Sequence, residues 1–558
     1  MKNLFRSIYR RGLYPLCNNS GFPSLPPYYP PIVPTRDILN AWQKSEWPEY
    51  QLFIHRHSIT DPDQWKHAYS QTTTWPWTPT ISIITPVFNT KKDELIECIL
   101  SVRLQTLQRW ELILSDDNST REETVSVLRS SLCKDPRIRI FFSRPDDPHG
   151  ISAASNRAIE QANGDYILFL DHDDRLAPDA LQKVAQQIIQ HPDTDLIYSD
   201  RDMISPSAQR YMHFCKPDWS PETLLSGNYL VHIMCFRKQL VEYVGGLRPE
   251  FDGAQDHDLL LRCSETSPKV IHIPEILYHY RQSEQSVALN PESKEYAYKA
   301  GIRCIRQHLK RKKIDALVAE QKNLWRGNYT VILPKKDTSS ILTITVDSSC
   351  PETYARTVTE ALQAESTAPF ILLLDKACSH AIDDADAILA SWCGLEAIAM
   401  VSGRLADTAD RLHYGGIHFD RDGIPIRDYV NFPVSEPGYM AVTSILRNIS
   451  APNPWNVLFK RSVWNKMHGF DPQFQGPYAL FDLALRALQQ GYRLLYQPQA
   501  QYRCPPKYPF ALEPDSDKIY FKHKWRSWLD QGDPYHNRNF QPNSTCYELD
   551  IPAPSQQE

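Results

Sequence analysis

The sequence lacks several features that would assign it to a common class at once. No apolar run approaches the roughly 18 residues that a membrane-spanning helix needs, and the N-terminus lacks the continuous apolar stretch of a secretory signal. The twelve cysteines are scattered and include no Cys-x-x-Cys pair, so neither a disulfide framework nor a zinc site is expected. These absences predict a soluble intracellular protein with reduced thiols.

An excess of basic charge is also absent. The 61 Lys and Arg against 66 Asp and Glu give a net charge of −5, which argues against nucleic acid as a partner. There is no GxGxxG after a strand, no P-loop, no HExxH and no GxSxG, so hydride transfer, P-loop phosphoryl transfer and zinc proteolysis lose support. The 558 residues, 42% hydrophobic and 23% charged, are ordinary for a globular chain of roughly three domains.

What is present, from about residue 80, is an alternation of short apolar runs with helical stretches. The apolar runs cover residues 81–85, 111–114, 138–142 and 166–170. This alternation is typical of a mostly parallel sheet that is flanked by helices, the α/β class.

Polar residues follow three of these runs directly. They occupy residues 86–89, 116–119 and 171–174, and two of the three segments are acidic. Ligands bind beyond the carboxyl ends of the strands in an open α/β sheet. The sequence therefore predicts a polar binding edge at this end of the sheet.

The same pattern recurs later in degraded form. Residues 244–251 and 258–262 resemble residues 467–474 and 482–486, while the segment that would match the Asp116 strand is missing. We therefore predict a duplicated fold with a truncated second copy. The predicted domains are a tether with a partly helical extension (1–78), a first α/β domain (79–336), a second α/β domain (337–505) and a C-terminal extension (506–558).

Three clusters could carry chemistry. Asp171 and Asp173 follow a strand, where carboxylates suit a hard divalent cation or simply a turn. Asp256 lies at the start of a predicted helix and is either a carboxylate base or a first-turn cap. His279 is a candidate third metal ligand, or a hydrogen-bonded structural residue.

Read together, these segments resemble the family 2 glycosyltransferases of the GT-A fold. The matching pieces occur in the family's order, at residues 83–89, 115–119, 154–156, 164–174, 253–259 and 278–281. The resemblance implies inverting transfer of a sugar from a nucleotide-diphosphate sugar to a saccharide or lipid-linked saccharide. It also implies a role in the synthesis of cell-surface polysaccharide on the cytoplasmic side of a membrane.

The resemblance further implies roles for individual residues on the nucleotide side of the site. Pro86 and Asn89 would lie beside the nucleotide, and Asp116 would contact the base. Asp171 would face the ribose and the metal. The sequence departs from the family's pattern at three positions: Asn118 stands where Gly is frequent, Ser155 where Arg is frequent and Tyr280 where Trp is frequent. These departures leave the identity of the donor sugar undetermined.

On the catalytic side, the resemblance implies a divalent metal, Mn²⁺ or Mg²⁺. Asp173 would ligate it, and His279 would reach the metal or the diphosphate. Asp256 would be the catalytic base. A cation that stabilises the leaving diphosphate and a carboxylate that takes the acceptor's proton together satisfy the needs of this reaction.

The second copy lacks these groups. Leu480 stands where Asp256 is expected, and Asp375-Lys376-Ala377 replaces the acidic segment. We predict that this copy folds but transfers no sugar, and that its role is structural or acceptor-binding. Trp455 and Tyr478 are candidates for stacking on sugars, with core packing as the alternative.

Two other functions stay open, a non-catalytic carbohydrate-binding scaffold and a nucleotidyltransferase. Two basic segments suggest peripheral contact with a membrane. Residues 1–16 place Lys2, Arg6, Arg10 and Arg11 among apolar residues, which predicts a basic amphipathic helix or else a solvated terminus. Residues 309–313 form a basic run that is either a solvated helix face or a contact for anions.

Overall fold

The computed structural model describes residues 31–282, 295–365, 367–509, 511–512 and 514–551. The chain divides into a short unit, Met1–Ile32, and a large one, Val33–Glu558. The features below belong to the large unit. The predicted amphipathic helix near the N-terminus lies outside the described residues.

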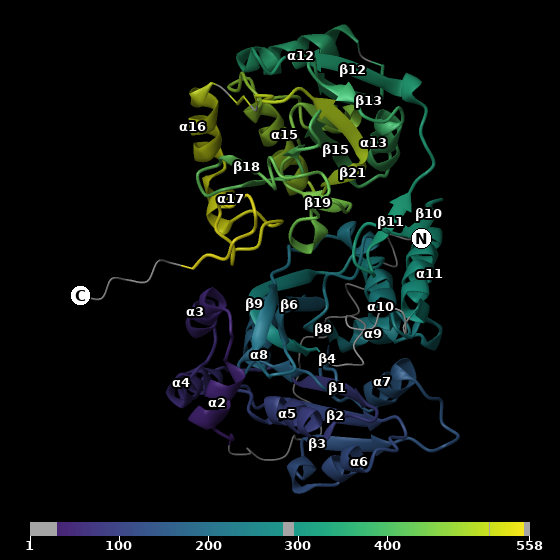
Figure 1. Ribbon diagram of the computed structural model, residues 1–558, viewed down its shortest axis with the longest axis vertical. Helices are drawn as coiled ribbons and strands as arrows, with labels where there is room; N and C mark the ends of the chain where they lie inside the picture. The colour runs from purple at the N-terminus through teal and green to yellow at the C-terminus, as the bar shows by residue number, and fades with distance from the viewer. Residues whose placement is uncertain (1–30, 283–294, 366, 510, 513, 552–558) are drawn as a thin grey trace, which may run out of the picture. The chain divides into compact units, whose positions relative to one another are not determined.

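The first sheet has the strand order β3-β2-β1-β4-β8-β6-β9-β5, and β7 pairs with β6 (Figure 1). Its first four strands are parallel to one another, β8 is antiparallel to both of its neighbours, and β9 is parallel to β6. The strands are β1 (Ile81–Val87), β2 (Trp110–Asp116), β3 (Ile138–Phe142), β4 (Tyr166–Phe169), β5 (Arg175–Leu176), β6 (Leu196–Ile204), β7 (Arg210–Phe214), β8 (Met234–Arg237) and β9 (Val270–Arg281).

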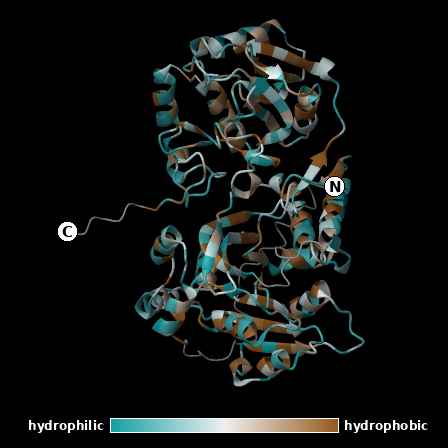
Figure 2. Cartoon of the chain, viewed as in Figure 1, coloured by the Kyte–Doolittle hydropathy of each residue, from teal (hydrophilic) through white to brown (hydrophobic). Residues whose placement is uncertain are grey.

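Helices flank this sheet because each connection between its parallel strands must cross a face of the sheet. Every residue of β1 and β2 is buried, as expected for strands that are covered on both faces. The helices are α5 (Lys92–Arg103), α6 (Glu122–Leu128), α7 (Ile151–Glu160), α8 (Ala180–Gln190), α9 (Lys238–Tyr243), α10 (Gln255–Ser264) and α11 (Glu295–Arg311). In Figure 2 the hydrophobic colour gathers on the strands and the hydrophilic colour on the loops.

The second sheet has the order β12-β13-β20-β15-β21-β14, with β16 on β15 and β19 on β21. Its strands are β12 (Ile341–Val346), β13 (Phe370–Asp375), β14 (Ser379–His380), β15 (Ile398–Asp407), β16 (Leu412–Tyr414), β19 (Arg447–Ile449), β20 (Asn456–Lys460) and β21 (Arg493–Cys504). Its helices are α12 (Tyr354–Ala364), α13 (Ala385–Cys393), α14 (Arg461–Lys466) and α15 (Tyr478–Gln489).

The two sheets share one topology. Replacing β1, β4, β8, β6, β9 and β5 by β12, β13, β20, β15, β21 and β14 reproduces the order and the parallel or antiparallel sense of each pair. The second sheet ends at β12, where the first continues into β2 and β3. The predicted α/β fold, duplicated with a truncated second copy, is therefore confirmed.

A buried ion pair repeats in both copies at matching positions. Arg262 donates to Asp258 and to the carbonyl oxygens of Val244 and Gly246. Arg486 donates to Asp482 and to the carbonyl oxygens of Met467 and Gly469. In each copy the arginine holds the end of a short helix (α9 or α14) against the next one (α10 or α15).

The N-terminal and C-terminal extensions pack on this framework. The described part of residues 31–78 forms α2 (Arg36–Trp42), α3 (Pro48–His57) and α4 (Pro62–Thr73), and the buried indole of Trp65 donates to the carbonyl oxygen of Leu104 at 2.7 Å. After β21 come α16 (Asp515–Lys524) and α17 (Arg526–Gln531), and Trp525 donates to Asp482. Asn537 and Asn539, further on, both donate to the buried carboxylate of Asp200 in β6.

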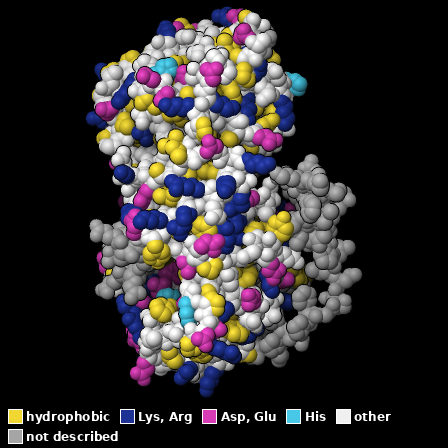
Figure 3. Space-filling model, turned by 90° about the vertical axis from the view of Figure 1, so that its right-hand side faces the viewer, with side chains coloured by type: hydrophobic (Ala, Val, Ile, Leu, Met, Phe, Trp, Pro, Cys, Tyr) yellow, Lys and Arg dark blue, Asp and Glu magenta, His cyan; other side chains and the backbone are white. Residues whose placement is uncertain are grey.

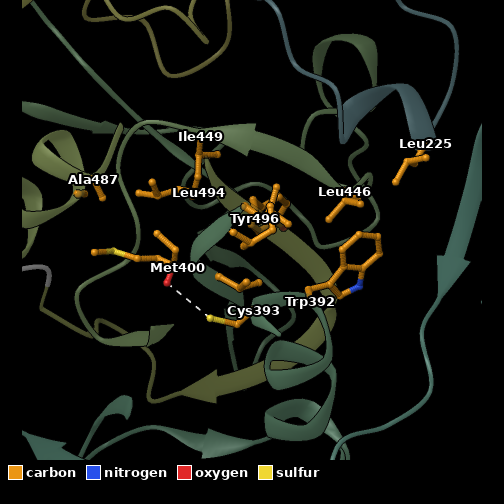
Figure 4. Close-up of a cluster of buried hydrophobic side chains, with 14 of the residues drawn as sticks. Leu225, Trp392, Cys393, Met400, Leu446, Ile449, Ala487, Leu494 and Tyr496 are labelled. Atoms are coloured by element: carbon orange, nitrogen blue, oxygen red, sulfur yellow. Dashed lines mark hydrogen bonds between the residues drawn. The ribbon is translucent and has the colours of Figure 1, made fainter. Parts of the chain in front are cut away.

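The segment η2 (Thr223–Leu225) of the first copy packs against the second copy. Figure 4 shows Leu225 in the same buried cluster as Leu446 and Trp392. The adjacent Glu222 accepts from Asn448 at 2.8 Å and from Arg493 at 2.7 to 2.9 Å. The contact between the copies is therefore partly ionic and poorly exposed to water.

Removing the charge at Arg493 should weaken this contact. Because Glu222 would lose its bidentate partner at a site where its side chain is 10% exposed, we expect Arg493→Ala to lower the free energy of unfolding by about 1–3 kcal/mol. Urea unfolding measures the change. The matched control is Arg526→Ala, whose exposed pair with Asp530 should cost less than about 1 kcal/mol. Equal losses in the two variants would contradict this account of the contact.

Burial settles one prediction about exposed features, while the basic run keeps both of its predicted alternatives. Trp455 and Tyr478 are almost fully buried, so both pack in the core and neither offers a ring to a sugar. The basic run at the end of α11 is exposed, and Figure 3 shows Lys and Arg gathered across the middle of the face on that side. Among the described helices, none has the length and apolar character that a membrane crossing requires.

Candidate active site

The ends of β1, β2 and β4 bring the predicted polar segments to one edge of the first sheet. Val87 is paired with Asp116 in the parallel register of β1 and β2. The next strand in the sheet, β4, ends just before Asp171, and Leu170 donates from its backbone to the carbonyl oxygen of Ile84. The strands that flank β1 therefore deliver both carboxylates to this edge: Asp116 is the last residue of β2, and Asp171 lies just beyond β4.

Pro86 and Asn89 shape this edge through the backbone. Pro86 is buried within β1, opposite Ser115 of β2. Asn89 adopts a left-handed backbone conformation with φ of 46°, and its side-chain oxygen accepts from the backbone N–H groups of Thr120 and Arg121 at 2.9 and 2.8 Å. The amide of Asn89 thus joins the loop after β1 to the loop after β2.

Asp116 has one carboxylate oxygen that is unpaired in the described part of the chain. Its Oδ2 accepts from the backbone N–H of Ser119 at 3.1 Å. Its Oδ1 is buried and has no hydrogen-bond partner in the described part of the chain. An unpaired buried acceptor is costly, so this oxygen suits a ligand that brings an N–H donor.

The acidic segment contains one structural carboxylate and two that are more accessible. Asp174 is fully buried and accepts from the Tyr278 hydroxyl and the Arg281 backbone N–H, both at 2.6 Å. Burial, together with the carboxylates of Asp173 and Asp171, raises the pKa of Asp174 well above its usual range. The side chains of Asp171 and Asp173 are 39% and 22% exposed.

Tyr278 and Arg281, both in β9, hold this segment in place. The Arg281 guanidinium donates to the backbone oxygen of Asp173 at 2.7 Å and pairs with Glu97 of α5. The Tyr278 hydroxyl also accepts from the backbone N–H of Asp171 at 3.2 Å. The loop that carries Asp171 and Asp173 is therefore pinned from the neighbouring part of the sheet.

His279 is not brought to these carboxylates. Its Nδ1 lies 2.6 Å from Oδ1 of Asp202, in a buried cluster with Arg210 and Tyr50. The imidazole is committed to this cluster because Asp202 is fully buried and needs hydrogen-bond donors. A different imidazole lies near Asp171: the Nε2 of His232 is 3.7 Å from its Oδ2.

The accessible carboxylates fit a hard divalent cation. Across the described residues there is no group of three or more His, Cys, Asp or Glu side chains that could hold a metal. Mg²⁺ in proteins is commonly bound by one or two carboxylates together with the phosphates of a substrate. Asp171 and Asp173 can supply that pair, and their negative charges add to the effect of burial in raising the pKa of Asp174.

Asp256 lies in the first turn of α10. The Asn228 side-chain amide donates to its Oδ2 at 2.9 Å, and the backbone N–H of His257 donates to its Oδ1 at 2.8 Å. Burial raises the pKa of this carboxyl group. Within the described residues, no hydrogen bond or ion pair joins Asp256 to the acidic segment.

Five site residues were not found from the sequence, namely Asp174, Tyr278, Arg281, His232 and Asn228. Asp174, Tyr278 and Arg281 lie inside the segments 164–174 and 278–281. The neighbouring residues in sequence, however, do not distinguish a carboxylate that accepts two internal hydrogen bonds from one that faces solvent. Asn228 follows η2 and belongs to no recognised motif.

Comparison with known protein families finds a match for the segment that carries most of the predicted site residues. Residues 82–241 match the model of "Glycosyl transferase family 2". The chain carries a family 2 glycosyltransferase domain. Pro86, Asn89, Asp116, Asp171 and Asp173 fall inside the matched segment, whereas Asp256 and His279 follow it.

Longer relatives extend the similarity beyond the glycosyltransferase domain. The chain is 30% identical to the uncharacterized protein y4gI of Sinorhizobium fredii, over 85% of this chain and 59% of that protein. It is 29% identical to the O-antigen biosynthesis protein RfbC of Myxococcus xanthus, over 82% of this chain and 40% of that protein. The chain thus spans less than two thirds of either relative.

Among solved structures, the chain is similar to S. aureus TarS 1–349. The TM-score is 0.33 at 18% sequence identity, and the match covers 41% of this chain and 65% of that one.

Proposed function

We propose that this chain is an inverting glycosyltransferase that moves a sugar from a nucleotide-diphosphate sugar to a saccharide or lipid-linked saccharide. The observation that carries the proposal is the meeting of Asp116, Asp171 and Asp173 at one edge of the first sheet, inside the matched domain. A role in cell-surface polysaccharide synthesis is supported by the name of one relative, the O-antigen biosynthesis protein of M. xanthus.

In this proposal the donor lies along the strand ends. The unpaired Oδ1 of Asp116 accepts from an N–H group of the nucleotide base. The loops at Pro86 and Asn89 border the nucleotide. Asp173 and Asp171 hold a divalent cation, Mn²⁺ or Mg²⁺, which when bound supplies charge stabilisation for the leaving diphosphate.

Asp256 takes the proton of the acceptor hydroxyl. Asn228 orients its Oδ2, and since no second donor contacts this oxygen among the described residues, one of its lone pairs stays open. Burial raises the pKa of Asp256, which makes its carboxylate a stronger base than that of an ordinary aspartate. Inversion follows if the hydroxyl attacks from the face opposite the diphosphate, with no covalent intermediate on the chain.

A hydrolysis screen tests the function. The chain is incubated with a panel of nucleotide sugars and Mn²⁺, and free nucleotide diphosphate is measured. We expect slow hydrolysis of at least one donor, because water can replace the acceptor at a competent site. A carbohydrate-binding scaffold would release nothing, and a nucleotidyltransferase would release pyrophosphate from a nucleoside triphosphate instead.

We also propose peripheral contact with the cytoplasmic face of a membrane through residues 1–16. The basic and apolar residues of this segment support the proposal. Deleting residues 1–16 should move the protein from the membrane fraction to the supernatant. Equal partition of the full-length and shortened chains would reject the contact.

A further inference from the structure

The second copy contains an open cavity between α12 and α14, here called the α12–α14 cavity. Its volume is about 330 Å³, within the range of small-molecule sites. Aromatic and polar side chains line it, among them Trp464, Phe470, Thr359, Gln363, Asn465 and His468. No Lys, Arg, Asp or Glu contributes to the described lining.

The indole of Trp464 is held in the wall of this cavity. Helix α14 ends in two left-handed residues, His468 with φ of 60° and Gly469 with φ of 73°. The backbone N–H of Gly469 donates to the carbonyl oxygen of Trp464 at 2.9 Å, and a Cβ at Gly469 would lie only 3.0 Å from the indole. Phe470 meets the indole edge to face at 4.7 Å, so the ring is fixed before any ligand arrives.

The corresponding place in the first copy is closed. There Val241 and Leu247 stand at the positions of Trp464 and Phe470 and are buried. Asn156 of α7 donates to the carbonyl oxygen of Leu247 at 2.8 Å and accepts from its N–H at 3.0 Å, which ties the helix to the turn. No comparable hydrogen bond joins α12 to residues 468–470 in the described structure, and the cavity lies open there.

The chemistry of the lining points to a sugar. Side-chain amides at Gln363 and Asn465 offer both donors and acceptors, which match the hydroxyl groups of a saccharide. An aromatic ring beside them suits the apolar face of a pyranose. The described lining has no Lys or Arg to pair with a uronic acid or a phosphate, which favours a neutral sugar.

We infer that the α12–α14 cavity binds a neutral hexose or N-acetylhexosamine unit of the acceptor chain. The inference rests on the proposed function for the identity of the acceptor, although the binding itself does not require transfer. It gives the second copy a use that is compatible with Leu480 and Ala377 in place of the catalytic carboxylates. The copy would hold a growing glycan while the first copy extends it.

Saturation-transfer NMR on the full chain tests the inference, with maltotetraose, chitotetraose and tetragalacturonate as probes. We expect transfer to at least one neutral tetrasaccharide and none to tetragalacturonate. Gln363→Ala combined with Asn465→Ala should weaken that binding at least tenfold. Both side chains are exposed, so this variant should keep the melting temperature of the parent chain.

Trp464→Phe is a second variant that retains an aromatic ring and should weaken binding less than Trp464→Ala. The matched controls are Glu242→Ala, at the position of Asn465 in the first copy, and Trp325→Ala, at an exposed tryptophan outside the cavity. Both controls should bind as the parent does. Binding that survives the double variant unchanged, or no transfer to either neutral probe, would overturn the inference.

Donor hydrolysis by the parent chain is measured alongside. Its failure would count against the proposed glycosyl transfer, whereas loss of saccharide binding only in the cavity variants would still support the site.

Discussion

Replacing Asp256 with asparagine should reduce sugar transfer by about 10²–10⁴-fold, the range that loss of a general base typically costs. Asparagine keeps the shape of the side chain, and its one carbonyl oxygen can still accept from the His257 backbone. Its amide nitrogen would then face Asn228, whose unpaired side-chain oxygen can turn to accept from it, so the fold and donor affinity should change little. Initial rates of transfer, with donor affinity from calorimetry, measure the two effects separately.

The pH dependence gives a second signature of the same group. Since burial raises the pKa of Asp256, the base becomes protonated at a pH above the ordinary aspartate range. Transfer should therefore fall on acidification through that raised pKa and reach its plateau at higher pH. In Asp256→Asn the residual rate should lose this acid limb.

The control for Asp256→Asn is Glu250→Gln, an exposed acid six residues earlier. It should transfer at the parent rate. Turnover within a few fold of the parent in Asp256→Asn would assign the proton transfer to another group.

The strands of the first sheet could be predicted from the sequence because each is a short apolar run that ends in polar residues. Residues 138–142 were predicted as a strand and form β3 with the same bounds. The helical stretch between β2 and β3 is short: α6 ends at Leu128, and a separate turn follows at Ser131–Cys133. The convergence of residues 116 and 171 on one edge follows from parallel pairing alone.

The immediate surroundings of the site could not be predicted in the same way, because they depend on contacts between distant parts of the chain. Tyr278 and Arg281 reach Asp174 from more than one hundred positions away. His279 lies between these two residues in the sequence, yet its imidazole pairs with Asp202 instead. A motif shows that a polar group is present, whereas the fold decides which partner it meets.

The duplicated sheets show the same limit of prediction from sequence, namely that contacts between distant segments are not visible in a motif. The matching segments made a second sheet predictable, and so did the loss of its β2 equivalent, because the segment that would match the Asp116 strand is missing. The described second sheet also lacks an equivalent of β3, which was not predicted. The pairing of Glu222 with Arg493 between the copies has no counterpart inside either copy. Pattern comparison therefore predicted each copy but not how the two are joined.

Asp173→Ala should abolish transfer and also the metal-dependent part of donor binding. The remaining carboxylate at Asp171 would face the donor's diphosphate without enough cation to screen the repulsion between them. Titration of donor with and without Mn²⁺ measures the effect: the parent should bind more tightly with the metal, and the variant should show no difference. Asp173→Asn should behave similarly, since an amide is a weaker ligand for hard cations.

The control for this variant is Asp146→Ala, an exposed acid in the loop after β3, which should keep metal-dependent binding. Asp174 is unsuitable as a control because its burial and its bonds to Tyr278 and Arg281 make any substitution a test of folding. A parent chain that transfers sugar at its full rate in excess EDTA would contradict the metal assignment. Metal dependence that persists in Asp173→Ala would assign metal binding to Asp171 alone or to another residue. The proposed role of Asp256 as the base would be unaffected.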